Sequence, residues 1–551
     1  MVRTALPLGL LLLCSVTTWA GESQPAQGMQ VKPHPDKIGI ELDGIGDGSR
    51  CMPFIDVAKT TRPYTKLNSG DLVATDSRGW PTADCQSVLF DIRPFPAWNP
   101  PIDDPEKFMP DWSGTYHLAL TGQAEVTSGE GDAKVQNATY IPATNTTEAE
   151  VVVPEGTGLL ILKFSHTRRS ATSAEGTGFS NLKLIRPGYP ANTKQVFTTE
   201  YLKALKPFAA LRFMDTLATN HNPGYYGDAG HHALEWQDRR LPMDATQQET
   251  GNKYGLAWEY IVSLANETGK DAWINIPIAA SDDYIRQLAQ FLKLKLKPNI
   301  RIYIEHSNEV WNFGFPQYIY NKLAAIDEVK KGGSPLNSDG SQDQEVWTHR
   351  RHLKRLHDIA MIFKDAFGAD QMLTRIRPIY ASWLISPDAH FKDVLQWGAN
   401  QFGEPKSYLY GIAAAAYYSD EKSAKDATPE QVLVTMQKAS DENMKFHAQL
   451  KPLADQYGLK YTQYEIGPDS GGGRLDNLAN RIRANRIPGM KDVVLHDATK
   501  WFEMGGDMYM YFASPSAYSR YGCWGLSEDI RQLNTPKWQA IYQMTGTTAP
   551  K

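Results

Sequence analysis

From Thr199 onward the chain alternates short apolar runs with longer amphipathic segments, and this alternation restricts the fold more than any other feature of the sequence. The apolar residues within 258–265 follow the spacing of one helix face, and Gly269 is typical of the residue that ends such a helix. Strands that alternate with helices predict a parallel α/β domain. The expected strands are 209–214, 272–278, 300–304, 375–380, 408–416, 460–464 and 508–512.

The number of these strands indicates a closed barrel. Seven are visible, and the stretch 215–272 has room for an eighth, around Leu234-Glu235-Trp236. Eight strands, each followed by a helix, make a (β/α)8 TIM barrel of about 350 residues. A doubly wound open sheet is the alternative, but no glycine-rich phosphate loop follows the first strand. We therefore predict the α/β class, with a (β/α)8 barrel over residues 191–551.

Residues 21–190 have a different character. A leader rich in Gln, Pro, Gly and Lys is followed, over 37–186, by short strand-like runs separated by Gly, Asn, Thr and Pro. Such a pattern without a clear amphipathic helix favours a β-sandwich. The turn-forming residues 187–190 then indicate a linker. We expect a β-rich N-terminal domain that either binds carbohydrate or only braces the barrel.

The first residues predict export. Arg3 precedes the apolar stretch 5–16, and the small residues near Ala20 suit cleavage by a signal peptidase, so residues 1–20 are expected to be a signal peptide. Leu13 before Cys14 argues against a lipoprotein, which has a small residue there. No later apolar stretch approaches the roughly 20 residues needed to cross a bilayer. The mature protein is expected to be secreted or periplasmic, without membrane insertion.

The charge of the chain and its cysteine and histidine residues indicate which binding partners, disulfides and metals to expect. The formal net charge is −5, and the chain has no basic run of the kind that follows nucleic acid. Of the cysteines left after export, Cys51 and Cys85 could form a disulfide, or all three thiols could be unpaired. His221, His231 and His232 are a poor ligand set, so no metal is predicted.

Two segments end in glutamates that are suited to catalysis. Residues 303–312 contain Asn308-Glu309, and residues 460–467 contain Glu465; each glutamate follows a strand-like run. The ends of barrel strands form the active site in TIM barrels, which places both acids at one face. Cleavage of a glycosidic bond requires two carboxyl groups brought together from different parts of the chain. Such chemistry needs no cofactor.

Counted back from 508–512 as strand 8, Glu309 follows strand 4 and Glu465 ends strand 7. In this order the chain resembles the retaining (β/α)8 glycoside hydrolases of clan A. The resemblance implies that Glu309 is the acid/base, that Asn308 bonds the sugar 2-hydroxyl and that Glu465 is the nucleophile. The segment is most similar to secreted bacterial glycosidase-like proteins of unknown activity, so no particular substrate is implied.

Neighbouring polar residues extend the predicted site. Arg212 is a cation in an apolar strand, so it needs a carboxylate partner. That partner is either Glu465 or a structural acid such as Asp215 or Glu305. Glu305 is expected to be a buried supporting group. His306 either tunes Glu309 or lines a sugar subsite, or else it is structural.

Four aromatic residues complete the predicted substrate-binding set. Tyr417 and Tyr418 end strand 6, where the resemblance implies a residue that positions the nucleophile; because strand neighbours face opposite ways, only one can point inward. Trp383 follows strand 5 and Trp524 follows strand 8, and both are candidate sugar platforms. The second is similar to the tryptophan that stacks under the reactive sugar in clan A.

These observations predict hydrolysis of glycosidic bonds in a poly- or oligosaccharide by a retaining double displacement. The two carboxyl groups should then lie about 5 to 5.5 Å apart. A non-catalytic carbohydrate-binding or pseudoenzyme module is the alternative. Structural roles are also possible for both acids, for example Glu309 at a helix N-terminus. Because every candidate follows the linker, a chain without 21–190 is expected to keep all catalytic groups.

Overall fold

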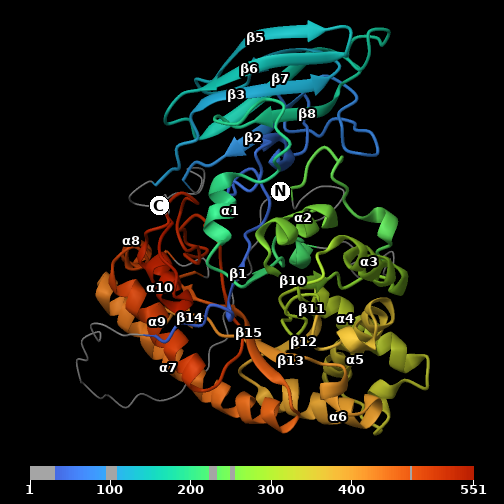
Figure 1. Cartoon of the computed structure of the whole chain (residues 1–551), viewed down its shortest axis with the longest axis vertical. Helices are drawn as coiled ribbons and strands as arrows, with labels where there is room; N and C mark the ends of the chain where they lie inside the picture. The colour runs from blue at the N-terminus through green and yellow to red at the C-terminus, as the bar shows by residue number, and fades with distance from the viewer. Residues whose placement is uncertain (1–30, 95–107, 222–232, 249–254, 472–474, 551) are drawn as a thin grey trace.

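Eight parallel strands close into a barrel in the computed structural model, which describes residues 31–94, 108–221, 233–248, 255–471 and 475–550 (Figure 1). All strand pairs in the barrel are parallel. The predicted TIM barrel is therefore confirmed. In order around the barrel the strands are β1 (Ile38–Glu41), β17 (Tyr509–Tyr511), β15 (Lys460–Ile466), β13 (Gly411–Ala415), β12 (Ile376–Ser382), β11 (Ile302–His306), β10 (Asp271–Ile276) and β9 (Ala210–Arg212).

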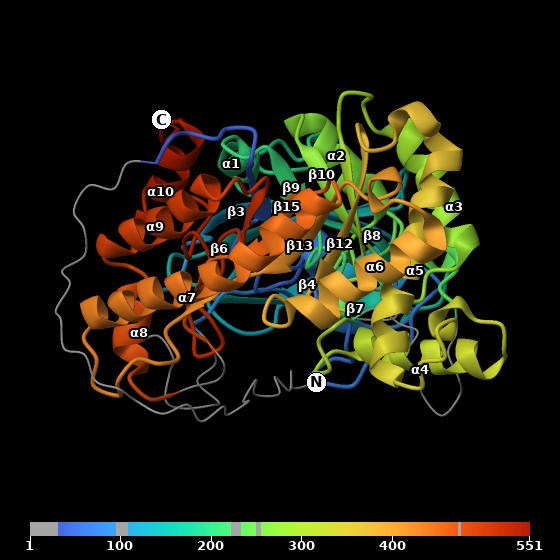
Figure 2. The same ribbon diagram turned by 90° about the horizontal axis from the view of Figure 1, so that it is seen from below.

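Helices lie outside these strands (Figure 2). The helix predicted from the spacing in 258–265 is present and ends before Gly269, which has the left-handed φ of 68°. The helices are α1 (Thr199–Leu205), α2 (Trp258–Thr268), α3 (Asp282–Lys295), α4 (Pro316–Lys330), α5 (Gln344–Phe367), α6 (Asp393–Phe402), α7 (Pro429–Gln456), α8 (Leu478–Ala484), α9 (Gly489–Glu503) and α10 (Pro536–Thr545).

Alternation along the strands separates two cores. Ile302 and Ile304 of β11 belong to the large apolar cluster that includes the helices, whereas Tyr303 between them belongs to the barrel interior. The interior is tightly filled: a Cβ at Gly39 of β1 would lie 2.5 Å from the sulfur of Met510. Where the strands end, the residues that face the barrel interior are polar. These polar side chains form the candidate site.

The position of the eighth strand was predicted wrongly. Residues 236–238 form a 3-10 helix, and Leu234 makes only an isolated bridge to Ala280. The missing strand is β1, which lies before the β-rich region and pairs with both β17 and β9. The division into 21–190 and 191–551 therefore needs correction, because the first barrel strand lies within the expected N-terminal domain. At four residues, β1 was too short to stand out from its neighbours.

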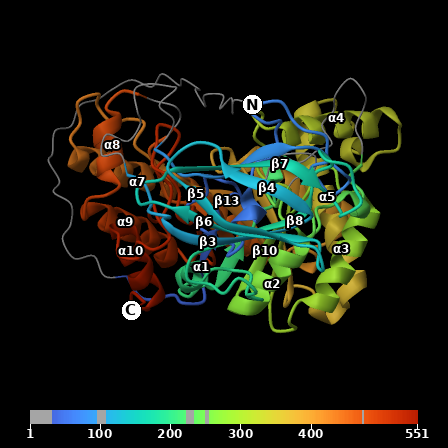
Figure 3. The ribbon, with the colours of Figure 1, turned by 90° about the horizontal axis from the view of Figure 1, so that it is seen from above.

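Between β1 and β9 the chain forms two antiparallel sheets, which lie at one end of the molecule (Figures 1 and 3). Buried residues of both, such as Leu118, Val151, Leu162 and Phe164, share one apolar cluster. One sheet has the order β2 (Cys85–Asp91), β7 (Leu159–Arg168), β4 (Gln123–Ser128), and the other β5 (Lys134–Ile141), β6 (Thr146–Val153), β3 (Gly114–Thr121), β8 (Ser180–Ile185). A further short pair, β14 (Tyr418–Ser419) with β16 (Pro468–Asp469), lies beyond the barrel strands.

The disulfide considered between Cys51 and Cys85 is absent, because both thiols and that of Cys523 are free and buried. The two residues lie in different apolar clusters: Cys51 packs with the barrel core, and Cys85 with the sheets. The Cys51 thiol instead donates to the carbonyl of Pro515, 3.1 Å away. Within the described ranges no helix has both the length and the apolarity to cross a membrane. The expected signal peptide, residues 1–20, lies outside them.

Candidate active site

Arg212 at the end of β9 is the centre of the site. It is fully buried, and its Nη1 lies 2.7 Å from Glu465 Oε1 and 3.0 Å from Glu41 Oε2, while its Nη2 lies 2.9 Å from Glu305 Oε2. Nη2 also donates to Asn308 Oδ1 over 2.8 Å. Burial alone would lower the pKa of Arg212, but the charges of the three glutamates outweigh it and raise the pKa well above its usual value. The guanidinium therefore stays cationic.

Two of these glutamates are supporting groups. Glu305 also accepts from the indole of Trp273 at 2.8 Å, and Glu41 accepts from the backbone N–H of Asp215 at 3.1 Å. Burial raises the pKa of both carboxyl groups, and Arg212 opposes the rise. Glu305 is thus buried as expected. Glu41 was missed by sequence reasoning, although the apolar alternation in Ile38–Glu41 would have placed its side chain in the barrel interior.

Glu465 is held by one cation and one phenol. Its Oε1 accepts from Arg212, and its Oε2 accepts from the hydroxyl of Tyr417 at 2.7 Å. Tyr418 is buried in the apolar cluster shared with the helices. Of the two tyrosines that the sequence left open, Tyr417 is therefore the one that reaches the site.

A β-bulge brings two successive side chains of β15 into the site. Strict alternation would send Tyr464 and Glu465 to opposite faces of the barrel. One step of β13, from Ala414 to Ala415, however spans two steps of β15, from Gln463 to Glu465. The extra residue re-aims the chain, as bulges beside active sites often do. Tyr464 consequently reaches Glu309, while Glu465 reaches Arg212.

Glu309 has a different environment. Its Oε1 accepts from Tyr464 at 3.3 Å and its Oε2 from Asn312 at 2.8 Å. Burial, with the charge of Glu465 second, raises the pKa of Glu309 to about 8, against the two hydrogen bonds. The backbone is left-handed at Ser307, with φ 58°, and at Glu309, with φ 43°. Non-glycine residues held in this region are found at functional sites. Glu309 remains partly exposed.

Asn308 is fixed on both sides. Its Oδ1 accepts from Arg212, and its Nδ2 donates to Asn220 Oδ1 over 3.1 Å. Gln317 of α4 donates to both the Asn220 side chain and the Asn308 carbonyl, at 2.7 and 2.8 Å. The amide is therefore oriented before any substrate binds.

His306 lies away from this group. As the last residue of β11 it faces α5, where its Nδ1 lies 3.0 Å from Nδ1 of His352 and the two rings stack. His352 Nε2 in turn contacts the Ala381 carbonyl at 3.0 Å. Burial lowers the pKa of His306 well below its usual value. Its recorded partners are structural, and the structure does not bring it together with Glu309.

The two expected tryptophan platforms lie with different glutamates. Trp524 donates its indole N–H to Asp469 over 3.0 Å and packs edge-on against Phe512, which packs edge-on against Tyr417. Trp524 is thereby linked to the Glu465 side. Burial raises the pKa of Asp469 to about 6. Asp469 was missed, since nothing in the sequence connects it to Trp524.

Trp383 lies with Glu309. Its ring stacks on Trp311, with centroids 5.5 Å apart and planes 6° from parallel. The indole N–H of Trp311 donates to the hydroxyl of Tyr464 at 3.2 Å, and that hydroxyl donates to Glu309. Trp311 was also missed, although its place two residues after Glu309 was a usable signal.

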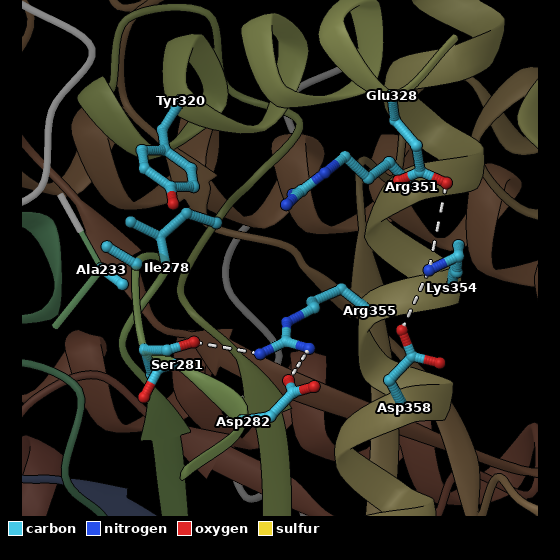
Figure 4. Close-up of a pocket in the computed structure, with 12 residues that line it drawn as sticks. Ala233, Ile278, Ser281, Asp282, Tyr320, Glu328, Arg351, Lys354, Arg355 and Asp358 are labelled. Carbon is cyan, nitrogen blue, oxygen red and sulfur yellow. Dashed lines mark hydrogen bonds and ion pairs between the residues drawn. The ribbon is translucent and has the colours of Figure 1, made fainter. Parts of the chain in front are cut away.

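A separate pocket of about 240 Å³ lies between the segment after β10 and helices α4 and α5 (Figure 4). Two of its cations have acid partners: Arg355 contacts Asp282 at 2.5 Å and Lys354 contacts Asp358 at 3.1 Å. The pocket lining includes none of the glutamates of the site described above, which are Glu41, Glu305, Glu309 and Glu465. This pocket is therefore separate from the group of side chains around Arg212.

In the part of the chain that the structure describes, no three His, Cys, Asp or Glu side chains are grouped as metal ligands would be. Of the histidines considered for a metal, His221 lies in the described residues, and His231 and His232 lie outside them.

Neither family models nor curated proteins match the chain. Solved structures are similar at low identity: a GH51 arabinofuranosidase from Xanthomonas axonopodis pv. citri has a TM-score of 0.38 and 12% identity over 61% of this chain and 64% of that one. A 4-O-α-L-rhamnosyl-β-D-glucuronidase from Fusarium oxysporum has 0.37 and 13%, over 62% and 63%. A Cellvibrio japonicus xylanase has 0.33 and 11%, over 88% and 99%. The chain thus spans less than two thirds of the first two proteins. Similarity at this level leaves function to the residues of the site.

Proposed function

We propose that the protein hydrolyses glycosidic bonds in a poly- or oligosaccharide by a retaining double displacement. The observation that carries the proposal is the contrast between two carboxyl groups. Glu465 contacts a buried cation and a phenol, whereas burial and the charge of Glu465 raise the pKa of Glu309 to about 8. A carboxyl group of raised pKa, together with a second carboxyl group held by a cation at the same end of a barrel, is what glycoside cleavage requires.

In the first step, a carboxylate oxygen of Glu465 bonds the anomeric carbon while the bond to the glycosidic oxygen breaks. Glu309 gives its proton to that oxygen, so the leaving group departs neutral. Arg212 and Tyr417 fix the attacking carboxylate, and Asn308 is oriented to bond the sugar 2-hydroxyl. In the second step, Glu309 as carboxylate takes a proton from water, which attacks the anomeric carbon and releases Glu465.

The proposal extends to the rest of the chain. We infer that the two antiparallel sheets pack as a β-sandwich, which is supported by their shared apolar cluster. Export through a signal peptide at 1–20 is proposed from the sequence alone. A carbohydrate partner is supported by the partly exposed tryptophans Trp383 and Trp524 beside the two acids.

Glu309→Gln and Glu465→Gln test the assignment together. After a panel of aryl glycosides identifies a sugar that the parent cleaves, both variants should lose turnover of the glycan. A dinitrophenyl leaving group needs no proton, so it should partly restore the Glu309 variant and not the Glu465 variant. Azide should attack in place of Glu465 and give product of inverted configuration. The reverse pattern, or activity in both variants close to the parent, refutes the assignment.

The same panel separates catalysis from the alternative of a non-catalytic carbohydrate-binding module. A binding module would show saturable sugar binding in calorimetry with no product. A control is needed for the Glu→Gln substitution itself. Glu305 is unsuitable because it contacts Arg212, whereas Glu155 is exposed and lies outside the barrel. Glu155→Gln should keep full turnover.

A further inference from the structure

The aromatic side chains at the site fall into two groups, each connected to one glutamate. Tyr417, Phe512 and Trp524 contact one another in series from Glu465. Tyr464, Trp311 and Trp383 form a second series from Glu309. The outer members of the two series come from different strand ends: Phe512 and Trp524 follow β17, whereas Trp311 follows β11 and Trp383 follows β12. Tyr464, which connects the second series to Glu309, lies in β15.

This division assigns sides to a substrate. In a retaining reaction the nucleophile bonds the anomeric carbon of the sugar that stays, and the acid protonates the oxygen of the group that leaves. Aromatic rings attached to the acid therefore lie where the leaving group lies. From this geometry we propose that Trp311 and Trp383 form the binding site for the leaving group, and that this group is a sugar or short oligosaccharide. The inference rests on the proposed function.

The stacking geometry of Trp311 and Trp383 is suited to binding a sugar. Centroids 5.5 Å apart with planes 6° from parallel correspond to an offset stack, which leaves part of each indole face uncovered. Both rings are partly exposed. The pair is also held in place: the Trp311 N–H is bonded to Tyr464, and Trp383 packs edge-on against His390 at 5.6 Å. Fixed rings with open faces suit the apolar face of a pyranose.

Two further large apolar side chains lie on the same two loops. Phe313 and Ile385 each lie two residues beyond one of the tryptophans and are 64% and 56% exposed. Large apolar side chains at this exposure gain from contact with a ligand. The leaving-group site is therefore expected to accept more than one sugar unit, with Trp383 at the first and Phe313 further out.

The test compares two substrates with the same sugar in the position that stays, chosen from the panel that the parent cleaves. One is an oligosaccharide, whose leaving group reaches the tryptophans, and the other is the glycosyl fluoride, whose leaving group does not. Trp383→Ala should lower kcat/KM for the oligosaccharide about ten- to a hundredfold, as for truncation of a tryptophan at a binding contact. The fluoride should react as in the parent.

A second measurement guards against a folding defect. Phe313→Ala changes an exposed residue and should weaken only substrates with a leaving group of two or more sugars. The matched control is Leu294→Ala, which is 76% exposed and lies near the end of α3, in the segment that leads to the start of β11 and not at the end of that strand. This variant should change nothing. In addition, a trapped 2-fluoro glycosyl enzyme of Trp383→Ala should be released by water at the parental rate but by added sugar acceptor more slowly.

The outcomes are distinct. If the parent cleaves no glycoside of the panel, the proposed function fails. If the parent cleaves both and Trp383→Ala loses both equally, or loses the fluoride more, the leaving-group assignment is overturned while the function stands. An acceptor-dependent rate that equals the parent's in Trp383→Ala also overturns it.

Discussion

Glu309→Gln is expected to stabilise the protein, and to do so only above mildly acidic pH. The folded pKa of Glu309, about 8, lies above its ordinary value of 4.5. A group whose pKa is raised by folding contributes stability that is fully present below 4.5 and is lost as pH rises through 8. At neutral pH the unfolded chain has released this proton and the folded chain still holds it. The raised pKa therefore lowers the unfolding free energy of the parent. The glutamine variant has no titrating group at this position and does not lose this stability.

The size of the effect follows from the two pKa values. The difference in proton binding costs the parent on the order of 3 kcal/mol at pH 7 and less than about 1 kcal/mol at pH 5. Glutamine should otherwise imitate the protonated acid. Its oxygen can accept from Asn312 and its amide can donate to the Tyr464 hydroxyl, so the two contacts of Glu309 are kept.

Urea unfolding followed by tryptophan fluorescence at several pH values measures the difference directly. The midpoint of the variant should exceed that of the parent increasingly from pH 5 to pH 8, with unchanged m. Because the charge of Glu465 is the second cause of the raised pKa, the gain should shrink when Glu465→Gln is already present. A gain that does not vary with pH, or a variant less stable than the parent at pH 7, refutes the reasoning. Glu155→Gln is the surface control.

Two further variants test the groups around Glu465, the proposed nucleophile. Arg212→Met leaves three glutamates without their shared cation and should cost about 3 to 5 kcal/mol of unfolding free energy, while Arg212→Lys should cost less because it keeps the charge; equal stability to the parent in urea would contradict this. Tyr417→Phe removes one hydrogen bond to Glu465 and should lower kcat about ten- to a hundredfold with the fold intact by circular dichroism; an unchanged kcat would exclude the role.

Features of the site that depend on neighbouring residues could be predicted from the sequence. Features that depend on contacts between distant segments could not. Apolar spacing and Gly269 are local signals, so α2 was predicted with its end. The order of strands placed Glu309 and Glu465 at matching ends, because order survives errors in strand boundaries. Glu41 was not found, since β1 offers four residues and its partner Arg212 lies 171 positions later. The bulge that turns both Tyr464 and Glu465 inward depends on pairing with β13 and has no local signature.

The two antiparallel sheets are inserted after β1, which explains why β1 was not recognised as a barrel strand. The way the insertion is connected also explains why the barrel can still close. The two segments that connect the sheets to the barrel pair with each other: Phe54 bridges Phe197, Asp56 bridges Ile185, and Ile55 accepts from the Arg186 N–H at 3.0 Å. To the barrel, the insertion thus behaves as a short connection between β1 and α1. Such a connection lies at the carboxyl end of β1, the same end that carries the catalytic groups in a TIM barrel.

Two truncations follow with opposite outcomes. Removal of 21–190 takes away β1 and with it Glu41, so one barrel strand and one partner of Arg212 are lost. That chain should not fold, contrary to the expectation from the sequence that it keeps every catalytic group. Replacement of 62–183 by a short turn keeps β1 and both connecting segments, and the cost of closing the shorter loop is small. This chain should fold and cleave the glycosyl fluoride, as measured by fluoride release. A folded and active chain without 21–190, or an unfolded one without 62–183, would show that the connecting segments do not have this role.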